Sequence, residues 1–338
     1  IPLAYLLQDS RLIEKAKPWI EWILTSSQPG GWFGPAKNED RWPLAVAMKA
    51  LLQYHEATGD NRVLTLLSKY FKYLAESPPD WPDREWRGVR AAENVVTAYW
   101  YYNRTGDPNA LKAAESIFSN SYDWAGYFHT FPFRANIVEM GVKHGHPSHV
   151  VNIGMAVKYP GLRYVLTKQD QYKEAVYEGL RNLDSHHGQV GGRFGADEHL
   201  AGRRPTQGTE LCGIVEMMYS MEILSELFAD PAFGDRLELL AYNCNPGTCT
   251  PDYWGHQYDQ QANQVLCSVA KRKWTTNGDT SNVYGVEPNY GCCTSNMHQG
   301  WPKLVSHLWM ATPDGGLAAV AYGPCEVTAR VGKGCLLY

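Results

Sequence analysis

The chain has 338 residues, enough to bury a substantial core in one large domain or two ordinary ones, and we expect one large domain. Its 31 basic and 35 acidic residues give a net charge of -4 without basic runs, so we expect no nucleic-acid partner. No segment approaches the roughly eighteen consecutive apolar residues of a membrane-spanning helix, so we expect no membrane span.

The first half of the chain predicts helices. Apolar residues recur there at intervals of three and four, and turn signals such as Thr58-Gly59-Asp60 and Thr105-Gly106-Asp107 separate the segments. We expect these helices at Ser10–Leu24, Trp42–Thr58, Arg62–Glu76, Ala91–Arg104 and Pro108–Ser119.

The second half predicts further helices and then strands. Residues 316–322 and 326–331 change to strand-like composition, with alternation in the second run. Repeated helix pairs of this size predict a mainly α protein, arranged as an α/α toroid. The expected helices are Val151–Leu166, Gln171–His186, Thr209–Ala229, Phe233–Tyr242 and a last one that begins near Ser295.

Three of the eight cysteines, together with one glutamate, form a candidate metal site. Glu210 and Cys212 stand close together, and Cys292 and Cys293 follow later in the chain. Zinc prefers four tetrahedral ligands drawn from cysteine, histidine and carboxylate groups, and these four side chains supply a complete set. The alternative is that the cysteines are small buried hydrophobic residues, since the usual Cys-x-x-Cys zinc spacing is absent.

Three blocks of sequence surround these residues and decide between the two interpretations. The blocks contain Gly191-Gly-Arg-Phe-Gly-Ala-Asp-Glu198 with Pro205-Thr-Gln-Gly-Thr-Glu210-Leu-Cys212, then residues 241–263, then Asn289-Tyr-Gly-Cys-Cys293-Thr-Ser-Asn296. In this order they resemble the zinc-dependent β-L-arabinofuranosidases, glycoside hydrolase family 127 and its relatives. The similarity extends from residue 90 to residue 310.

The resemblance implies a fold. Members of that family have an (α/α)6 barrel catalytic domain followed by a β-sandwich. We therefore expect residues 1–314 to form the (α/α)6 barrel and residues 315–338 to be the start of a β-sandwich that is cut short.

The resemblance also implies a catalytic centre. It assigns Glu210, Cys212, Cys292 and Cys293 as zinc ligands, Cys292 as the zinc-bound nucleophile and Glu198 as the acid/base. Metal coordination deprotonates a thiol at neutral pH and leaves its sulfur polarisable enough to attack. Protonating a leaving group requires a raised pKa, so we expect one at Glu198. The alternative for Glu198 is a solvated loop carboxylate.

Five further residues are candidates for substrate binding. His149 lies in a segment that resembles one at the barrel mouth of the family, so it is expected to hydrogen-bond the sugar. His256, Gln257, Tyr258 and Asp259 are expected to line the pocket. For Tyr258 and Asp259 the alternative is that they satisfy buried polar groups.

The function that the resemblance implies is that of a retaining glycoside hydrolase. It would release L-arabinofuranose from β-L-arabinofuranosides through a thioglycosyl enzyme at Cys292, with a plant cell-wall glycan or glycoprotein arabinoside as partner. The 12 tryptophans and 21 tyrosines suit stacking on sugars, although most will lie in the core. The alternatives are a related glycosidase for another plant cell-wall sugar, or a non-catalytic zinc-stabilised carbohydrate-binding protein.

The amino-terminal sequence bears on location. The chain begins at Ile1-Pro2 without methionine and lacks a charged start followed by an apolar stretch, so any signal peptide is gone or was never included. We expect a secreted or periplasmic protein, in which Asn103-Arg-Thr105 would be a glycosylation acceptor if the chain is secreted. The oligomeric state is not readable from these patterns.

Overall fold

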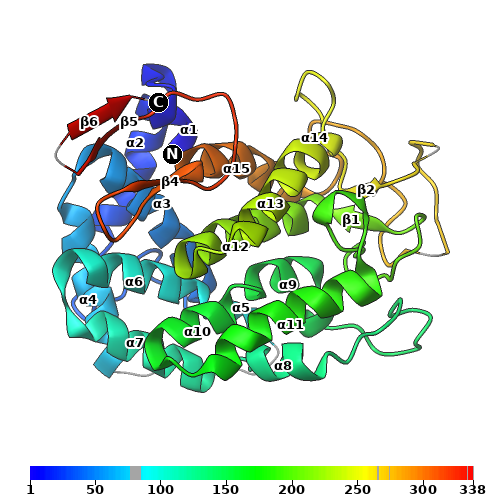
Figure 1. Cartoon of the computed structure of the whole chain (residues 1–338), viewed down its shortest axis with the longest axis horizontal. Helices are drawn as coiled ribbons and strands as arrows, with labels where there is room; N and C mark the ends of the chain where they lie inside the picture. Colours follow the sequence, from blue (N-terminus) through cyan, green and yellow to red (C-terminus); the bar gives the residue numbers. More distant parts are fainter. Residues whose placement is uncertain (77–84, 265, 274, 333, 338) are drawn as a thin grey trace. The chain divides into compact units, whose positions relative to one another are not determined.

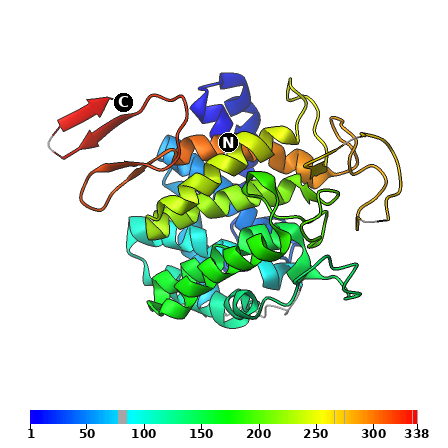
Figure 2. The ribbon, with the colours of Figure 1, turned by 45° about the vertical axis from the view of Figure 1, so that its right-hand side comes forward.

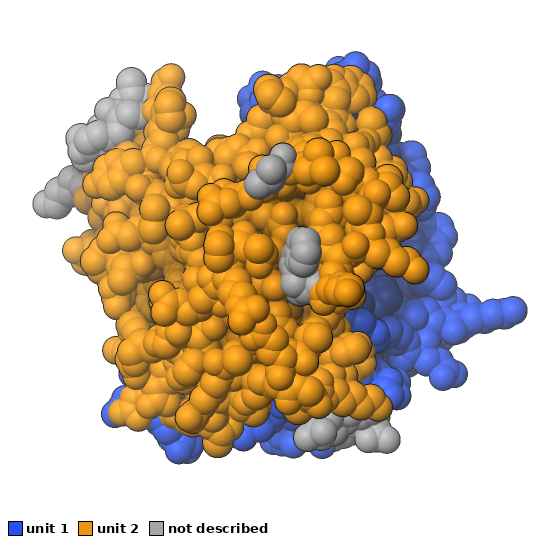
Figure 3. Space-filling model, turned by 90° about the vertical axis from the view of Figure 1, so that its right-hand side faces the viewer, with its two compact units in different colours: residues 1–126, 162–172 blue, residues 127–161, 173–338 orange. Residues whose placement is uncertain are grey.

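The structure is a computed structural model that describes residues 1–76, 85–264, 266–273, 275–332 and 334–337. It divides into two compact units, which Figure 3 distinguishes by colour. Unit 1 comprises residues 1–126 and 162–172, and unit 2 comprises residues 127–161 and 173–338. Helices dominate the described residues, so the prediction of a mainly α protein is confirmed (Figure 1).

Unit 1 is helical. Asp9 and Asp107 cap two of its helices by accepting from backbone N–H groups, and Gly59 and Gly106 end two others in the left-handed conformation. The helices are α1 (Pro2–Leu6), α2 (Ser10–Thr25), α3 (Trp42–Thr58), α4 (Arg62–Glu76), α5 (Trp86–Arg90), α6 (Glu93–Thr105) and α7 (Pro108–Asn120).

These helices match the sequence predictions where capping and periodicity act together. The predicted bounds of α3 and α4 are confirmed, and those of α2, α6 and α7 are correct to within two residues. The short helices α1 and α5 were not predicted, because five residues carry too little periodicity to be recognised.

Unit 2 contains the longest helices and all the described strands. Three helices run across the unit boundary, namely α8 (Trp124–Thr130), α10 (Tyr159–Thr167) and α11 (Asp170–His187). The helices of unit 2 itself are η1 (His146–Ser148), α9 (Val150–Ala156), η2 (Val190–Gly192), α12 (Leu211–Phe228), α13 (Pro231–Leu239), the π-helical turn η3 (Leu240–Cys244), α14 (Asn245–Gly247) and α15 (Gly291–His307).

Helix α12 is the centre of unit 2. It is buried on all sides from Leu211 to Ser225 and packs against both α9 and α15 (Figures 1 and 2). Small residues allow the crossing with α9, since a Cβ on Gly154 would stand 3.0 Å from the carbonyl oxygen of Gly213. Ser220 also donates to the carbonyl oxygen of Gly154 at 2.6 Å. The amino-terminal ends of these three helices carry residues of the candidate site: His149 and Glu210 are the N-cap residues of α9 and α12, and Cys292 lies in the first turn of α15.

Three helix predictions need correction. The helix expected at Val151–Leu166 is broken into α9 and α10, because Pro160 has no N–H to donate to the carbonyl of residue 156. The helix expected from Thr209 begins at Leu211, because residues 208–210 form strand β1. The last helix begins at Gly291 rather than near Ser295, so both cysteines of the Gly-Cys-Cys run lie in its first turn.

The strands form three separate antiparallel pairs. β1 (Gly208–Glu210) pairs with β2 (Asp259–Gln261), β3 (Trp309–Ala311) with β4 (Leu317–Ala319), and β5 (Thr328–Val331) with β6 (Gly334–Leu337). β4 and β5 lie within the two predicted strand segments. In Figure 2 the red β5–β6 hairpin lies far from the loops that follow β2. Residues 333 and 338 fall outside the described part, and the boundary at residue 315 stays a prediction.

The prediction of no membrane span agrees with the helices that the structure describes. None of them combines enough length with enough apolar character to cross a bilayer.

Candidate active site

The four side chains predicted as metal ligands converge in unit 2. The ligand atoms of Glu210, Cys212, Cys292 and Cys293 all lie within 4.8 Å of one another. The sulfurs of Cys212 and Cys293 are 3.4 Å apart, and the sulfur of Cys292 lies 3.9 Å from Oε1 of Glu210. A tetrahedral zinc ion with bonds of about 2.3 Å to sulfur separates its ligand atoms by about 3.8 Å. The four side chains therefore have the spacing of a tetrahedral zinc site.

Backbone pairing places these ligands. Glu210 ends β1, where it lies opposite Asp259 of β2, and the chain then turns directly into α12 with Cys212 in its first turn. The N–H of Leu211 donates to the carbonyl of Tyr258 at 2.9 Å, which fixes this junction. The first turn of α15 brings Cys292 and Cys293 to the same place, because α15 packs on α12.

Burial distinguishes the three cysteines. Glu210, Cys212 and Cys293 are almost completely buried, whereas Cys292 is exposed. Oε2 of Glu210 is also buried, and it has no hydrogen-bond partner among the described residues. A buried carboxylate oxygen without a partner is costly, so a cation held by these four side chains would satisfy it.

The electrostatics of the cluster also favour a cation. Burial, followed by the charges of Glu198 and Cys292, raises the pKa of the Glu210 carboxyl well above its usual value. Burial also raises the pKa of the Cys212 and Cys293 thiols. Hydrogen bonds from these two thiols lower the pKa of Cys292 to about 3. Negative charge thus gathers on the sulfur of Cys292, and a divalent cation would allow the other three groups to ionise with it.

Glu198 lies beside this cluster. Ligand atoms of His149, Glu198 and Glu210 lie within 4.8 Å of one another, so Glu198 and the cysteines share one site. Nε2 of His149 is 3.1 Å from Oε1 of Glu198, and the hydroxyl of Tyr258 donates to Oε2. The Glu198 carbonyl accepts from the N–H of Val150, which joins this loop to the start of α9.

The pKa of Glu198 differs from the expectation of a raised value. Burial acts to raise the pKa of this carboxyl, but the hydrogen bonds from His149 and Tyr258 outweigh burial, so its pKa lies below the usual value. The sequence motif does not show these two donors, because one lies far before Glu198 in the chain and the other far after it. A raised pKa at this position is therefore not present in the structure.

The other predicted substrate-binding residues, His256, Gln257 and Asp259, are buried. Nε2 of His256 lies 2.9 Å from the hydroxyl of Thr294, one residue beyond Cys293. Gln257 donates to the hydroxyl of Tyr284 at 3.1 Å. The carboxyl of Asp259 is buried, and burial followed by the charge of a neighbouring aspartate raises its pKa well above its usual value.

Two residues at the site were missed by the sequence prediction. Tyr290 stacks on Tyr258 with ring centroids 4.0 Å apart, and Thr294 links His256 to the helix that carries the cysteines. Both stand next to the Gly-Cys-Cys run, so their closeness to the ligands was a usable signal. Their roles are to hold Tyr258 and the first turn of α15 in position.

The residues present fit a zinc ion. Three cysteines and one carboxylate are the donor types that zinc takes, and their spacing, burial and unsatisfied oxygen all agree with a tetrahedral site. Zinc bound there would be held by Glu210, Cys212, Cys292 and Cys293, with Cys292 on the exposed side.

Comparison with known proteins gives a family match. The family model of the beta-L-arabinofuranosidase GH127 catalytic domain matches residues 4–306. No curated protein matches the sequence.

Solved structures share the fold at low sequence identity. A glycoside hydrolase is similar with a TM-score of 0.73 at 17% identity, over 98% of this chain and 57% of the other. A GH127 beta-L-arabinofuranosidase from Geobacillus stearothermophilus T6 gives 0.67 at 16%, over 98% and 58%. A GH127 beta-arabinofuranosidase gives 0.67 at 19%, over 99% and 55%. The chain thus spans less than two thirds of each of these relatives.

The family model covers most of the chain, and the segment it matches contains Glu198, Glu210 and all three converging cysteines. The resemblance seen in the sequence blocks is therefore confirmed. The chain belongs to the GH127 beta-L-arabinofuranosidase catalytic-domain family.

Proposed function

We propose that the protein is a retaining glycoside hydrolase that releases L-arabinofuranose from β-L-arabinofuranosides, with Cys292 as nucleophile and Glu198 as acid/base. The observation that carries this proposal is the position of Cys292. It is the one exposed thiol of the converging three, and it shares a site with a carboxylate that two side chains hold in place. Family membership and the names of the similar structures support the sugar.

The first half of the reaction forms a covalent intermediate. The sulfur of Cys292 attacks the anomeric carbon, and the bond from that carbon to the leaving oxygen breaks. Glu198 in its acid form gives its proton to that oxygen. When bound, zinc keeps the thiol of Cys292 deprotonated at neutral pH and makes the thiolate a better leaving group in the second half.

The second half reverses these roles. Glu198, now a carboxylate, takes a proton from water while the water oxygen attacks the anomeric carbon. The carbon–sulfur bond breaks and its electron pair returns to Cys292. Two displacements at one carbon give net retention of configuration.

The helical arrangement suits this proposal. We propose that residues 1–314 close into an (α/α)6 barrel and that residues 315–338 begin a β-sandwich. The helical fold shared with the GH127 structures supports the barrel, and the β5–β6 pair supports the sandwich. The β3–β4 pair crosses the proposed boundary, because β3 ends at Ala311.

The alternative is a non-catalytic zinc-stabilised carbohydrate-binding protein. In that case the four ligands would serve only the fold, and no acid/base is needed. The position of Glu198 favours the enzyme, because a structural zinc site gives no reason for a hydrogen-bonded carboxylate within 4.8 Å of one of its ligands, Glu210. A glycosidase for another plant cell-wall sugar uses the same residues, and a substrate panel separates it.

The testing experiment compares the wild type with Cys292→Ser and Glu198→Gln on p-nitrophenyl β-L-arabinofuranoside, with zinc measured on each sample. We expect kcat to fall by about a thousandfold or more in both variants, because each loses a group that takes part in bond breaking. Glu198→Gln should keep its zinc. Released arabinose is followed by NMR to show retention.

Two matched controls exclude a general effect on folding. Cys325→Ser replaces an exposed thiol that is not one of the clustered side chains, and Glu174→Gln replaces an exposed carboxylate on α11. Both should keep wild-type activity. Full zinc content with no hydrolysis of arabinofuranosides or of other plant sugars by the wild type would establish the structural alternative instead.

A further inference from the structure

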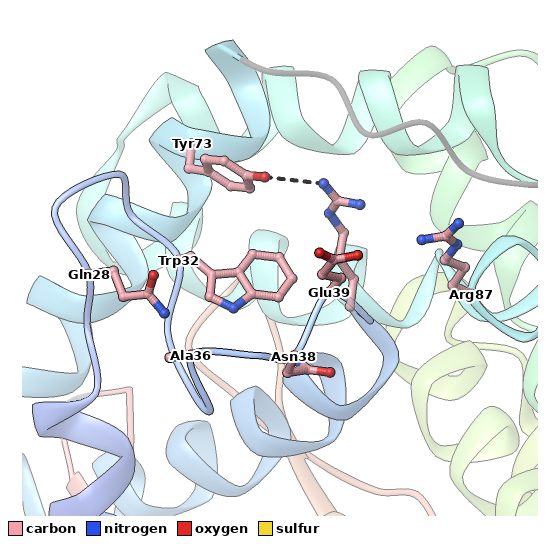
Figure 4. A pocket seen from close by; sticks show the side chains of 8 residues that line it. Gln28, Trp32, Ala36, Asn38, Glu39, Tyr73 and Arg87 are labelled. Atoms are coloured by element: carbon pink, nitrogen blue, oxygen red, sulfur yellow. Dashed lines mark hydrogen bonds between the residues drawn. The ribbon is translucent and has the colours of Figure 1, made fainter.

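A hollow lies entirely within unit 1 and shares no residue with the candidate active site. Its volume is about 500 Å³, within the range of ligand-binding pockets. The α2–α3 loop, Tyr73 near the end of α4, and Arg87 of α5 line it (Figure 4). The GH127 reaction proposed above makes no use of this hollow.

The loop that forms the hollow is held in a defined shape. Gly31 has φ +94°, and a Cβ there would collide with the backbone oxygen of Lys69, so only glycine fits. The N–H of Gln28 donates to the carbonyl of Trp32 at 2.8 Å, which closes the turn. These constraints fix Trp32 at the wall of the hollow.

Aromatic rings and a guanidinium form that wall. The rings of Trp32 and Tyr73 stand edge to face, with centroids 6.0 Å apart and an interplanar angle of 80°. The guanidinium carbon of Arg41 lies 5.6 Å from the centre of the Trp32 ring, and Nη2 donates to the Tyr73 hydroxyl at 3.2 Å. The contacts hold all three groups in place before any ligand binds.

The remaining lining carries both donors and acceptors. Figure 4 shows Glu39, Asn38 and Gln28 around Trp32, with Arg87 beyond Glu39. Neither Glu39 nor Arg87 makes a side-chain hydrogen bond or ion pair within the described ranges. A guanidinium only donates, a carboxylate only accepts, and an amide does both.

This mixture selects a class of ligand. The lining holds one carboxylate and two guanidinium groups, so an anion or a cation meets a charge of its own sign as well as an opposite one. An apolar molecule would leave the polar groups without partners. A neutral ring with several hydroxyl groups satisfies them all, since each hydroxyl both donates and accepts, while an apolar ring face can lie against Trp32.

We propose that the hollow of unit 1 is a carbohydrate-binding subsite that takes a neutral sugar ring against Trp32. The sugar hydroxyls pair with Glu39, Asn38 and Arg87. The inference rests on the proposed function in one respect, namely that the substrate is a glycan with more than one sugar to bind. Binding itself is measurable without any hydrolysis.

The test is a titration of the protein labelled with 5-fluorotryptophan, followed by fluorine NMR. Trp32→Phe identifies the Trp32 resonance among those of the 12 tryptophans. L-arabinose and D-galactose should shift this resonance saturably, with a Kd of about 1–10 mM for a single sugar ring. The resonance of Trp19, which is 74% exposed on α2 outside the hollow, should stay in place.

A charge variant tests the assignment of a neutral ligand. Glu39→Gln removes a charged acceptor but keeps the size of the side chain, so the Kd for L-arabinose and D-galactose should rise about tenfold. The same change should tighten binding of D-galacturonate, whose carboxylate Glu39 repels. Glu115→Gln, on the exposed face of α7, is the matched control and should change neither.

Two results would overturn the inference. One is a Trp32 resonance that none of the sugars moves, and the other is a response to D-galacturonate alone in the wild type. An assay of arabinofuranoside hydrolysis on the same sample tests the proposed function independently of the subsite. If the sample hydrolyses the arabinofuranoside but the Trp32 resonance does not move, the subsite is refuted and the proposed activity is kept. If the resonance moves but no hydrolysis occurs, the subsite is kept and the proposed activity is refuted.

Discussion

Glu198 shows how two neighbouring side chains set the properties of one carboxyl group. His149 and Tyr258 both approach its oxygens, and together they hold its pKa below the usual value against the effect of burial. In the proposed reaction Glu198 gives a proton and then takes one back, so the two donors fix its orientation, while the lowered pKa confines its acid form to low pH. In that proposed reaction Tyr258 is a positioning residue for Glu198.

Removing the Tyr258 hydroxyl tests this role. In Tyr258→Phe we expect kcat/KM to fall by about ten- to a hundredfold, because the carboxyl loses one of its two partners. The pKa of Glu198 should rise, since a donor to its charged form is gone, so the alkaline limb of the pH profile moves to higher pH. Steady-state rates from acid to alkaline pH measure both effects.

The matched control is Tyr177→Phe, which removes a hydroxyl that donates to Asp230 at 2.9 Å on another part of unit 2. Its pH profile should match that of the wild type. If Tyr258→Phe loses activity while its alkaline limb stays in place, Tyr258 acts on the substrate directly and the positioning role is wrong.

At the scale of elements, the crossing of α9 and α12 depends on glycine. A Cβ on Gly213 would collide with Cγ2 of Val150, and both residues are buried. Valine in a helix has one strongly preferred rotamer, so Val150 cannot turn aside cheaply. We expect Gly213→Ala to lower the free energy of unfolding by about 2 kcal/mol, measured by urea denaturation.

Gly145→Ala is the control for this change. Its backbone is extended, with φ −171°, and the nearest atom to a new Cβ is 3.9 Å away on Pro147. It should leave stability nearly unchanged. Equal stability of Gly213→Ala and the wild type would mean that α9 moves away from α12 without cost.

The contact of α12 with α15 carries a pH dependence. Nδ1 of His307 lies 3.0 Å from Oε2 of buried Glu222 and 2.7 Å from the carbonyl of Lys303. Burial acts to lower the pKa of His307, but the charge and hydrogen bond of Glu222 and the carbonyl of Lys303 raise it to about 9. The contact therefore favours the protonated imidazole in the folded protein.

The sign of the stability effect follows from the raised pKa. The folded value of about 9 exceeds the reference value of 6.5, so this stabilisation is complete below pH 6.5 and is lost as pH rises through 9. We expect urea denaturation to show a loss of about 3 kcal/mol between pH 6 and pH 10 from this group.

Glu222→Gln should remove most of that pH dependence, and at pH 6 it should lower stability by about 3 kcal/mol because a buried partner is lost. An unchanged pH dependence in Glu222→Gln would assign the effect to other groups.

At the scale of the whole molecule, the four candidate metal ligands join segments that lie far apart in the sequence. The β1–α12 junction and the first turn of α15 meet at this cluster, and α12 packs on α15. A metal that binds the folded protein and not the unfolded chain stabilises it by about 4 kcal/mol at a thousandfold excess over its Kd. We therefore expect the metal to contribute to the stability of unit 2.

Chelation measures this contribution. Incubation with 1,10-phenanthroline should lower the Tm by about 10 °C, since each kilocalorie shifts the midpoint by about 2–4 °C at this size. The isomer 1,7-phenanthroline, which does not chelate, is the control and should have no effect. The same Tm in both reagents, with the zinc shown to be removed, would contradict a stabilising metal.

The sequence predicted the long helices and the ligand set, but not the exact starts of the elements that carry the site. The ends of α3 and α4 were predictable because proline, glycine and apolar spacing agree there. The start of α12 was not, because the three residues of β1 form a strand only when β2 pairs with them. The start of α15 was placed too late because no capping side chain marks it.

The sequence by itself indicated the helical character, the family and the four side chains that converge, because capping, periodicity and ordered motifs are local properties of the chain. Only the tertiary structure decided that Cys292 is the exposed thiol and that His149 and Tyr258 hold Glu198. It also decided that Asp259 is buried and that a hollow exists in unit 1. Exposure and partner choice depend on segments brought together by packing, and no spacing along the chain encodes them.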